Sequence, residues 1–190
     1  MKKNIIILLG AIAILFSCAR PPEDEMNRAI EALSRAENDA DAVMYAPNYI
    51  SRSREALAKM QEEANSKRYE SAKTYAEEAI SNAERAISEG SIAAARAGDN
   101  AAALLNSLAV PLAETEANLN AAKEVPNIEL DFAPLEGMLD SAKRSYDSAL
   151  DSLSENNFRD ALSRGQNVQP ILSNINSQIS GATVATFKKQ

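Results

Sequence analysis

The sequence predicts an all-α protein in which two degenerate three-helix units form an elongated antiparallel helical bundle after an N-terminal signal segment. Apolar residues recur at spacings of three and four along most of the chain, which is the period of an amphipathic helix. Short polar stretches, such as residues 65–68, separate these apolar runs. The order of motifs in residues 23–97 also recurs in residues 100–180, as expected for an internal repeat.

The first predicted unit, residues 23–97, opens with three acidic residues that favour a helix N-terminus through the helix dipole. Its first helix should run to about Met44. Tyr45-Ala46-Pro47 then interrupts the pattern, because the residue before a proline is pushed out of the helical region. Two more helices follow, and the alanine-rich third one allows a partner helix to approach closely. The apolar stripes are Met26, Ile30, Leu33, Ala40 and Met44; Ile50, Leu57, Met60 and Ala64; and Ala72, Ala76, Ala79, Ile80, Ala83 and Ile87.

A break between the units is expected at Gly98-Asp99-Asn100, which combines a helix stop with a new N-cap. In the second unit, residues 100–180, Pro111 should kink the first helix, and Phe132-Ala133-Pro134 takes the place of Tyr45-Ala46-Pro47. The apolar stripes are Leu104, Leu108, Leu112, Leu119 and Ala122; Leu135, Met138, Leu139, Ala142, Tyr146, Ala149, Leu150 and Leu153; and Ala161, Leu162, Val168, Ile171, Leu172, Ile175 and Ile179.

The repeat is degenerate. Tyr69-Glu70-Ser71-Ala72 aligns with Phe158-Arg159-Asp160-Ala161 at an offset of 89 residues, whereas the two Ala-Pro turns align at 87. A two-residue difference in one connection accounts for the mismatch. A true duplication and a chance alignment of two alanine-rich hairpins both remain open. Gly165 and Pro170 should weaken the last helix, and residues 181–190 are expected to form a frayed, flexible tail.

The N-terminus carries a secretory signal pattern, with Lys2 and Lys3 before 12 apolar or small residues that end at Phe16. Leu15, Phe16 and Ser17 precede Cys18, the single cysteine of the chain. This stretch resembles the lipobox of bacterial lipoproteins, although Phe16 departs from the small residue that is common there. The resemblance implies a signal peptide at residues 1–17, a covalent lipid on Cys18 and a lipidated tether at residues 18–22. A plain cleaved signal and an uncleaved anchor are the alternatives; the apolar run is short for an anchor, which takes roughly 20 residues.

Composition restricts the chemistry that the chain can perform. There is no histidine, and the net charge is −7. Without histidine the chain lacks the commonest metal ligand and general base, and an acidic surface repels nucleic acid. Acidic pairs such as Glu77 and Glu78 are typical of solvated helix faces. We therefore expect no enzymatic activity, no catalytic residue, no metal site, no cofactor other than the lipid, and no nucleic-acid partner.

A second resemblance rests on Tyr45-Ala46-Pro47 through Ala56-Leu57, then Tyr69-Glu70-Ser71-Ala72, then the alanine-rich stretch to Ala86. This region is similar to a helical-hairpin domain of unknown function found in bacterial envelope lipoproteins, and more distantly to a tetratricopeptide helix junction. The resemblance implies an envelope location and a helical, adaptor-like body, and it implies no activity.

Two functions remain after these exclusions. The first is a membrane-anchored, non-catalytic structural or protein-interaction adaptor with an envelope protein partner. The second is a periplasmic carrier that binds an apolar ligand or peptide between the helical units. Ala19 and Arg20 follow Cys18 in place of the aspartate that retains some lipoproteins at the inner membrane, which favours the outer membrane. A homo-oligomer is also possible, since long helices can pair between copies.

Overall fold

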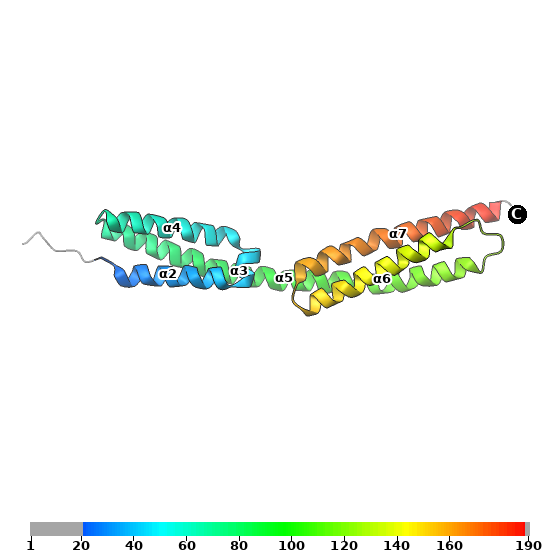
Figure 1. The fold of residues 1–190 in the computed structure, drawn as a ribbon, viewed down its shortest axis with the longest axis horizontal. Helices are drawn as coiled ribbons and strands as arrows, with labels where there is room; N and C mark the ends of the chain where they lie inside the picture. The colour runs from blue at the N-terminus through cyan, green and yellow to red at the C-terminus, as the bar shows by residue number, and fades with distance from the viewer. Residues whose placement is uncertain (1–20, 189–190) are drawn as a thin grey trace, which may run out of the picture. The chain divides into compact units, whose positions relative to one another are not determined.

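The structure is a computed structural model that describes residues 21–188. In this part of the chain all regular secondary structure is α-helical, which confirms the predicted all-α fold. The helices, α2 to α7, form two compact units, of which the first ends at Ser91 and the second begins at Ile92 (Figure 1). The predicted signal peptide, the lipobox residues and Cys18 lie outside the described residues.

Unit 1 contains α2 (Glu23–Asn38), α3 (Ala40–Tyr45), α4 (Pro47–Asn65) and the first part of α5 (Tyr69–Lys123). The prediction of one uninterrupted helix from residue 23 to Met44 was wrong, because the chain breaks at Asp39. The Asp39 backbone is extended, and its side-chain Oδ1 accepts a hydrogen bond from the backbone N–H of Ala42 at 2.8 Å. Asp39 thus ends α2 and caps the N-terminus of α3, as aspartate often does.

Gly90 of α5 allows α3 to lie very close to α5. A Cβ atom added at Gly90 would fall 2.6 Å from the backbone nitrogen of Ala42 and 2.7 Å from its Cα. Real Cβ atoms do not approach backbone so closely, so α3 would have to move. The position of α3 therefore requires that residue 90 be a glycine, which has no side chain.

The predicted helix stop at Gly98-Asp99-Asn100 was also wrong, because α5 runs without interruption from Tyr69 to Lys123. A glycine inside a helix costs only about 1 kcal/mol relative to alanine. Ala94 and Ala101, two turns apart on either side of Gly98, are both buried. A Cβ added at Gly98 would meet the Phe158 ring at 3.2 Å, so the glycine leaves room for this aromatic side chain. Packing on both sides thus outweighs the local preference for a break.

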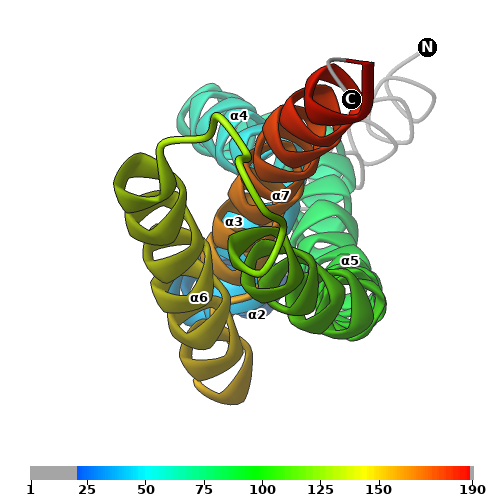
Figure 2. The same ribbon diagram turned by 90° about the vertical axis from the view of Figure 1, so that its right-hand side faces the viewer.

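Unit 2 contains the rest of α5, the loop 124–131, α6 (Phe132–Ser154) and α7 (Phe158–Lys188). Figure 2 looks along this unit, with the end of α5, α6 and α7 around a shared interior. Residues 125–131, which contain Pro126, and the polar residues 155–157 favour non-helical connections, and both lie outside helices. Pro111 and Pro170 both lie inside continuous helices. Since α7 reaches Lys188, the expected fraying is wrong for residues 181–188, where Thr186 is buried.

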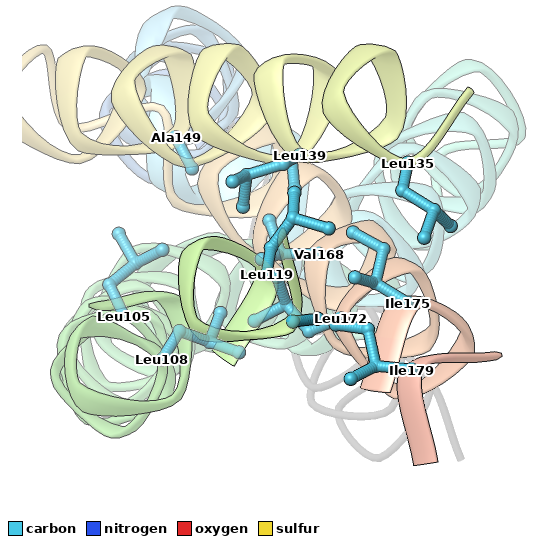
Figure 3. Packing of buried hydrophobic residues seen from close by; sticks show 12 residues of the cluster. Leu105, Leu108, Leu119, Leu135, Leu139, Ala149, Val168, Leu172, Ile175 and Ile179 are labelled. Carbon is cyan, nitrogen blue, oxygen red and sulfur yellow. The ribbon is translucent and has the colours of Figure 1, made fainter. Parts of the chain in front are cut away.

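The two units differ in the size of the side chains that fill their cores. In unit 2 most buried residues are leucine, isoleucine or valine. Leu135 of α6 points toward Ile175 of α7, as Figure 3 shows. In unit 1 most buried residues are alanine: Ala29, Ala32, Ala36, Ala42, Ala56, Ala72, Ala76, Ala79, Ala83 and Ala86. Its helices can therefore approach closely, as the sequence predicted.

The turn between α4 and α5 and the turn between α6 and α7 are built in the same way. In each turn the central residue, Lys67 or Asn156, has a positive φ of 60°. Each turn has four backbone hydrogen bonds, and the two sets correspond at an offset of 89 residues. They are Ser66 to Glu62, Lys67 to Ala64, Arg68 to Glu63 and Ala72 to Arg68; and Glu155 to Asp151, Asn156 to Leu153, Asn157 to Ser152 and Ala161 to Asn157.

The same offset relates the buried positions of the helices that flank these turns. The pairs, all buried, are Ala46 and Leu135, Ile50 and Leu139, Ser53 and Ala142, Met60 and Ala149, Ala72 and Ala161, Ala79 and Val168, Ala83 and Leu172, and Ala86 and Ile175. The shared turn and the shared burial support the predicted repeat.

The Ala-Pro motifs do not occupy equivalent places in this repeat. Pro47 is the first residue of α4, whereas Pro134 is the third residue of α6. At the offset of 89, the residue equivalent to Ala46 is Leu135, and both are buried. The prediction that Phe132-Ala133-Pro134 takes the place of Tyr45-Ala46-Pro47 was therefore wrong, because α6 begins before the position equivalent to Pro47.

Candidate interaction surfaces

The two predicted turn motifs lie at helix starts. Tyr45 ends α3, Ala46 is buried, and Pro47 begins α4. The Tyr45 hydroxyl is buried and has no hydrogen-bond partner among the described residues. In the second motif, the backbone N–H of Ala133 donates a hydrogen bond to Oδ1 of Asp131 at 3.3 Å. In the structure these motifs act as helix-start elements, and Cys18, Leu15, Phe16 and Ser17 stay predictions.

Within residues 21–188, no three histidine, cysteine, aspartate or glutamate side chains lie where together they could hold a metal ion. None of the helices described there is long and apolar enough to cross a membrane.

Large apolar side chains are exposed on both units. On α3, Val43 is 50% exposed and the adjacent Met44 is 45% exposed. On α7, Val184 and Phe187 are both more than half exposed, and Phe187 at 64% is the most exposed of the set. The remaining exposed large apolar residues among those described are Ile30, Ile92, Val110 and Leu150. Val43 and Met44 are adjacent in sequence, and Val184 and Phe187 are three residues apart, a spacing that places two residues on one face of a helix.

An open hollow of about 720 Å³ lies between α2 and α5 in unit 1. Its lining is mainly charged: Arg28, Ile30, Glu31, Ser34, Arg35, Ile80 and Glu84. The ion pair between Lys73 Nζ and Glu25 Oε1, at 3.4 Å, joins the same two helices. A hydrogen bond from its own backbone, and then the ammonium of Lys73, lower the pKa of Glu25 from its usual value. This seam is therefore a surface of mixed charge.

Two hollows of about 410 and 240 Å³ lie between α5 and α7 in unit 2. We call this surface the α5–α7 seam. One hollow is lined by Asn118, Ala121, Ala122, Val125, Asn176, Ile179, Ser180 and Thr183, and the other by Ser107, Leu108, Pro111, Gln169, Leu172, Ser173 and Asn176. No ionisable side chain is among these residues, and Asn176 lines both hollows.

A chain of side-chain hydrogen bonds crosses the α5–α7 seam at Asn176. Nδ2 of Asn176 donates to Oγ1 of the buried Thr115 at 2.7 Å, and Nδ2 of Asn118 donates to Oδ1 of Asn176 at 3.1 Å. Two neutral amides and a hydroxyl thus join the helices here. In unit 1 an ion pair joins the corresponding helices, so the two units use different polar chemistry.

The hollows of the two units occupy equivalent positions in the repeat. Each lies between the first and the third long helix of its unit. Ile80 and Glu84 of the unit 1 hollow correspond, at the offset of 89, to Gln169 and Ser173 of the α5–α7 seam. The fold thus provides the same hollow twice, once with a charged and once with an uncharged lining.

Three cations lie over tyrosine rings between α4 and α5. The guanidinium carbons of Arg52 and Arg85 are 5.5 and 5.0 Å from the centroid of the Tyr49 ring. Nζ of Lys59 is 5.5 Å from the centroid of the Tyr75 ring. Both rings also pack against the core of unit 1. The two tyrosines therefore serve in the packing of unit 1, and cations cover both rings.

Ion pairs reinforce both helix turns. Arg68 forms two hydrogen bonds with Glu63, one of them from Nη2 to Oε1 at 2.8 Å. The Arg68 hydrogen bond lowers the pKa of Glu63. At the second turn, Asp160 Oδ2 accepts hydrogen bonds from Nε of Arg164 at 2.5 Å and from the Ser152 hydroxyl at 2.7 Å. These two bonds, that of Arg164 first, lower the pKa of the Asp160 carboxyl.

The α5–α7 seam is the surface that reasoning from the sequence missed. The signal was present: no aspartate, glutamate, lysine or arginine occurs from Gly165 to Phe187, in a chain that is 25% charged. Apolar stripes and single motifs do not reveal this seam, because the absence of charge is what distinguishes it.

Comparison with known proteins assigns a domain to part of the chain. Residues 24–102 match the family model of a domain of unknown function, DUF4398. The match covers the helices of unit 1 and continues along α5. No curated protein and no solved structure matches the chain. The resemblance to a helical domain of unknown function is thus confirmed for residues 24–102, whereas the lipoprotein assignment stays a prediction.

Proposed function

We propose that this chain is a bacterial lipoprotein, anchored in the cell envelope through a lipid on Cys18, whose helical body is a non-catalytic adaptor for a protein partner. The signal pattern and the lipobox resemblance at Leu15, Phe16 and Ser17 support the anchor. The outer membrane is the proposed location, since Ala19 and Arg20 follow Cys18.

The observation that carries the adaptor proposal is the exposed apolar pair on α3. Val43 and Met44 are each about half exposed, while Ala42 beside them is fully buried. The Asp39 cap and the close approach at Gly90 hold α3 in a fixed position. Apolar side chains that are held rigidly on an outer surface are suited to protein recognition, because little conformational entropy is lost when a partner covers them.

The tether keeps this surface near the bilayer. Four residues separate Cys18 from the first residue of α2, Glu23, and two of them are Pro21 and Pro22. At the rise of a polyproline helix the five steps from Cys18 to Glu23 reach roughly 15 Å. A lipid on Cys18 would therefore hold unit 1 close to the membrane, where a partner in the envelope is available.

The anchor is tested by fatty-acid labelling in cells and by fractionation of membranes. Cys18→Ala should abolish the label and release the protein from membranes, because the acylated sulfur is lost. Ser17→Ala is the matched control, since alanine also suits a small-residue position, and it should keep both. Persistence of the label in Cys18→Ala would refute the anchor.

The adaptor role is tested with a photo-crosslinking amino acid placed at Met44 in intact cells. A discrete protein adduct should form there, and Val43→Ser should weaken it. The same amino acid at Gln61, an exposed polar position on α4, should give no such adduct. Equal adducts from both positions, or none from Met44, would contradict a partner site on α3.

Recovery of lipid and no protein with the chain after crosslinking in cells would contradict the adaptor role.

A further inference from the structure

We propose that the turn between α4 and α5, residues 65–68, contacts the phosphate groups of a zwitterionic phospholipid bilayer through the side chain of Lys67. This inference rests on the proposed lipid anchor at Cys18, and it names the part of the helical body that meets the membrane. It does not involve the partner surface on α3, which adjoins the other end of α4.

The α4–α5 turn lies at the end of unit 1 where the tether joins α2. Nζ of Lys73, in the second turn of α5, is 3.4 Å from Oε1 of Glu25, in the first turn of α2. Met26 of α2 packs against the same core cluster as Ala64, near the end of α4. Figure 1 shows the start of α2 and this turn at the same end of unit 1.

The tether is short compared with the helices of unit 1. Five steps lead from Cys18 to Glu23, and a fully extended chain covers at most about 18 Å in five steps. The 19 residues of α4 span roughly 28 Å. Of the two ends of unit 1, the end with the α4–α5 turn is therefore the one that an acylated Cys18 holds at the headgroups.

The backbone of the turn does not favour a lysine at its centre. Lys67 has a φ of 60°, in the left-handed region where glycine and asparagine are the common residues. The other residues with positive φ within 21–188 are both asparagines, Asn127 and Asn156. Asn156 takes the equivalent place in the α6–α7 turn, where the backbone hydrogen bonds correspond. Asparagine would therefore suit this turn better than Lys67 does.

The surroundings of Lys67 do not explain its positive charge either. The dipole at the C-terminus of α4 favours a cation at this position, whereas the dipole at the N-terminus of α5 disfavours one. Lys67 is exposed and has no ion-pair partner among the described residues, whereas the adjacent Arg68 is paired with Glu63. The charge of Lys67 is thus available to a group outside the chain.

The charges around the turn fit a headgroup that carries both signs. An ammonium such as that of Lys67 forms strong, charge-assisted hydrogen bonds with phosphate. The exposed carboxylates of Glu23 and Asp24 in α2 and of Glu70 in α5 surround this end of unit 1, and they suit the ammonium group of a zwitterionic headgroup. A bilayer of anionic lipid alone would repel these carboxylates over roughly 10 Å.

The test uses a chain that begins at Cys18 and is coupled through the Cys18 thiol to a maleimide phospholipid in vesicles of phosphatidylcholine and phosphatidylethanolamine. The anchor is supplied chemically, so a failure here concerns the contact, whereas fatty-acid labelling in cells tests the anchor. A photo-crosslinking amino acid at Ser66 should form an adduct with phospholipid. The same amino acid at Asn48, an exposed residue at the other end of α4, should form little.

Equal adducts from Ser66 and Asn48, or no adduct from Ser66, would overturn the proposal. Vesicles of phosphatidylglycerol should give a weaker adduct from Ser66 than the zwitterionic vesicles do. A stronger adduct there would contradict the match to a zwitterionic headgroup.

Lys67→Asn isolates the charge, because asparagine suits the positive φ. It should lower the Ser66 adduct about two- to fivefold, since one cation near a phospholipid surface contributes at most about that much. Urea unfolding should show that this variant is no less stable than the original chain. The matched control is Arg35→Gln, which removes one positive charge from an exposed position in the last turn of α2 and should leave the adduct unchanged. An adduct that withstands Lys67→Asn, or that falls equally in the control, would rule out Lys67 as the contact.

Discussion

At the scale of single residues, two glycines inside helices differ in their surroundings: one allows a close contact between helices, and the other faces open space. A side chain at Gly90 would collide with the backbone of Ala42, whereas one at Gly137 of α6 would meet nothing within 4 Å. The same substitution should therefore have opposite effects at the two sites.

We expect Gly90→Ala to destabilise unit 1 by about 1 to 3 kcal/mol, which is typical of overpacking. Gly137→Ala should stabilise the chain by up to about 1 kcal/mol, the difference in helix propensity between the two residues. Urea unfolding followed by circular dichroism measures both effects. A Gly90→Ala chain as stable as the Gly137→Ala chain would mean that α3 does not contact α5 at this point.

Asp160 should make stability depend on pH. Its pKa is lowered in the folded state, so its contribution is complete above the pKa of the unfolded chain and is lost as the pH falls through the folded value. The melting temperature should therefore drop on acidification from about pH 5 to pH 2, and Asp160→Asn should make that drop smaller. Asp147→Asn, which removes an exposed carboxyl with no partner among the described residues, should leave the drop unchanged.

At the scale of helices and turns, the positive φ of Lys67 predicts the effect of a glycine. Glycine adopts φ values near 60° without strain, whereas other residues pay a cost. Lys67→Gly should therefore raise the free energy of unfolding by roughly 0.5 to 1 kcal/mol. Ser66→Gly should bring no gain, because Ser66 has a φ of −80°. Chemical denaturation measures the free energy of unfolding of both variants. A loss of stability in Lys67→Gly would contradict the turn geometry.

The helices themselves were largely predictable from sequence, and their interruptions were not. Apolar spacing is a local signal, and it correctly predicted α4 and α6. The stripes that did so pass through Ile50 and Met60 and through Leu135 and Ala149. The break at Asp39 and the continuity through Gly98 depend on contacts with Gly90 and with Phe158, which lie far away in sequence. A capping residue or a glycine has only a local tendency to end a helix. Tertiary packing determines whether the helix ends there.

The candidate surfaces were less predictable than the helices. The exposure of Val43 and Met44 follows from the short helix α3, and the sequence placed Met44 on a buried stripe. The α5–α7 seam depends on which helices become neighbours. The uncharged run from Gly165 to Phe187 can be read from the sequence, but its meeting with Asn118 of α5 requires the fold.

At the scale of the whole molecule, the two units should differ in stability. Burying a leucine or isoleucine side chain contributes about 1.5 to 3 kcal/mol, and the alanines of unit 1 contribute less. Hydrogen exchange should therefore be faster at the backbone amides of α4 than at those of α6. Equal protection in both helices would show that the chain unfolds as one cooperative body.

The alanine core also restricts how the two units can diverge over evolutionary time. Few residue types can replace a tightly packed alanine, because glycine weakens the helix and any larger residue pushes the neighbouring helix away. Leucine, isoleucine, valine and methionine, in contrast, exchange at modest cost when the total volume is kept. Sequence similarity to relatives should therefore remain detectable for longer in unit 1 than in unit 2. The family match at residues 24–102 falls mainly in unit 1.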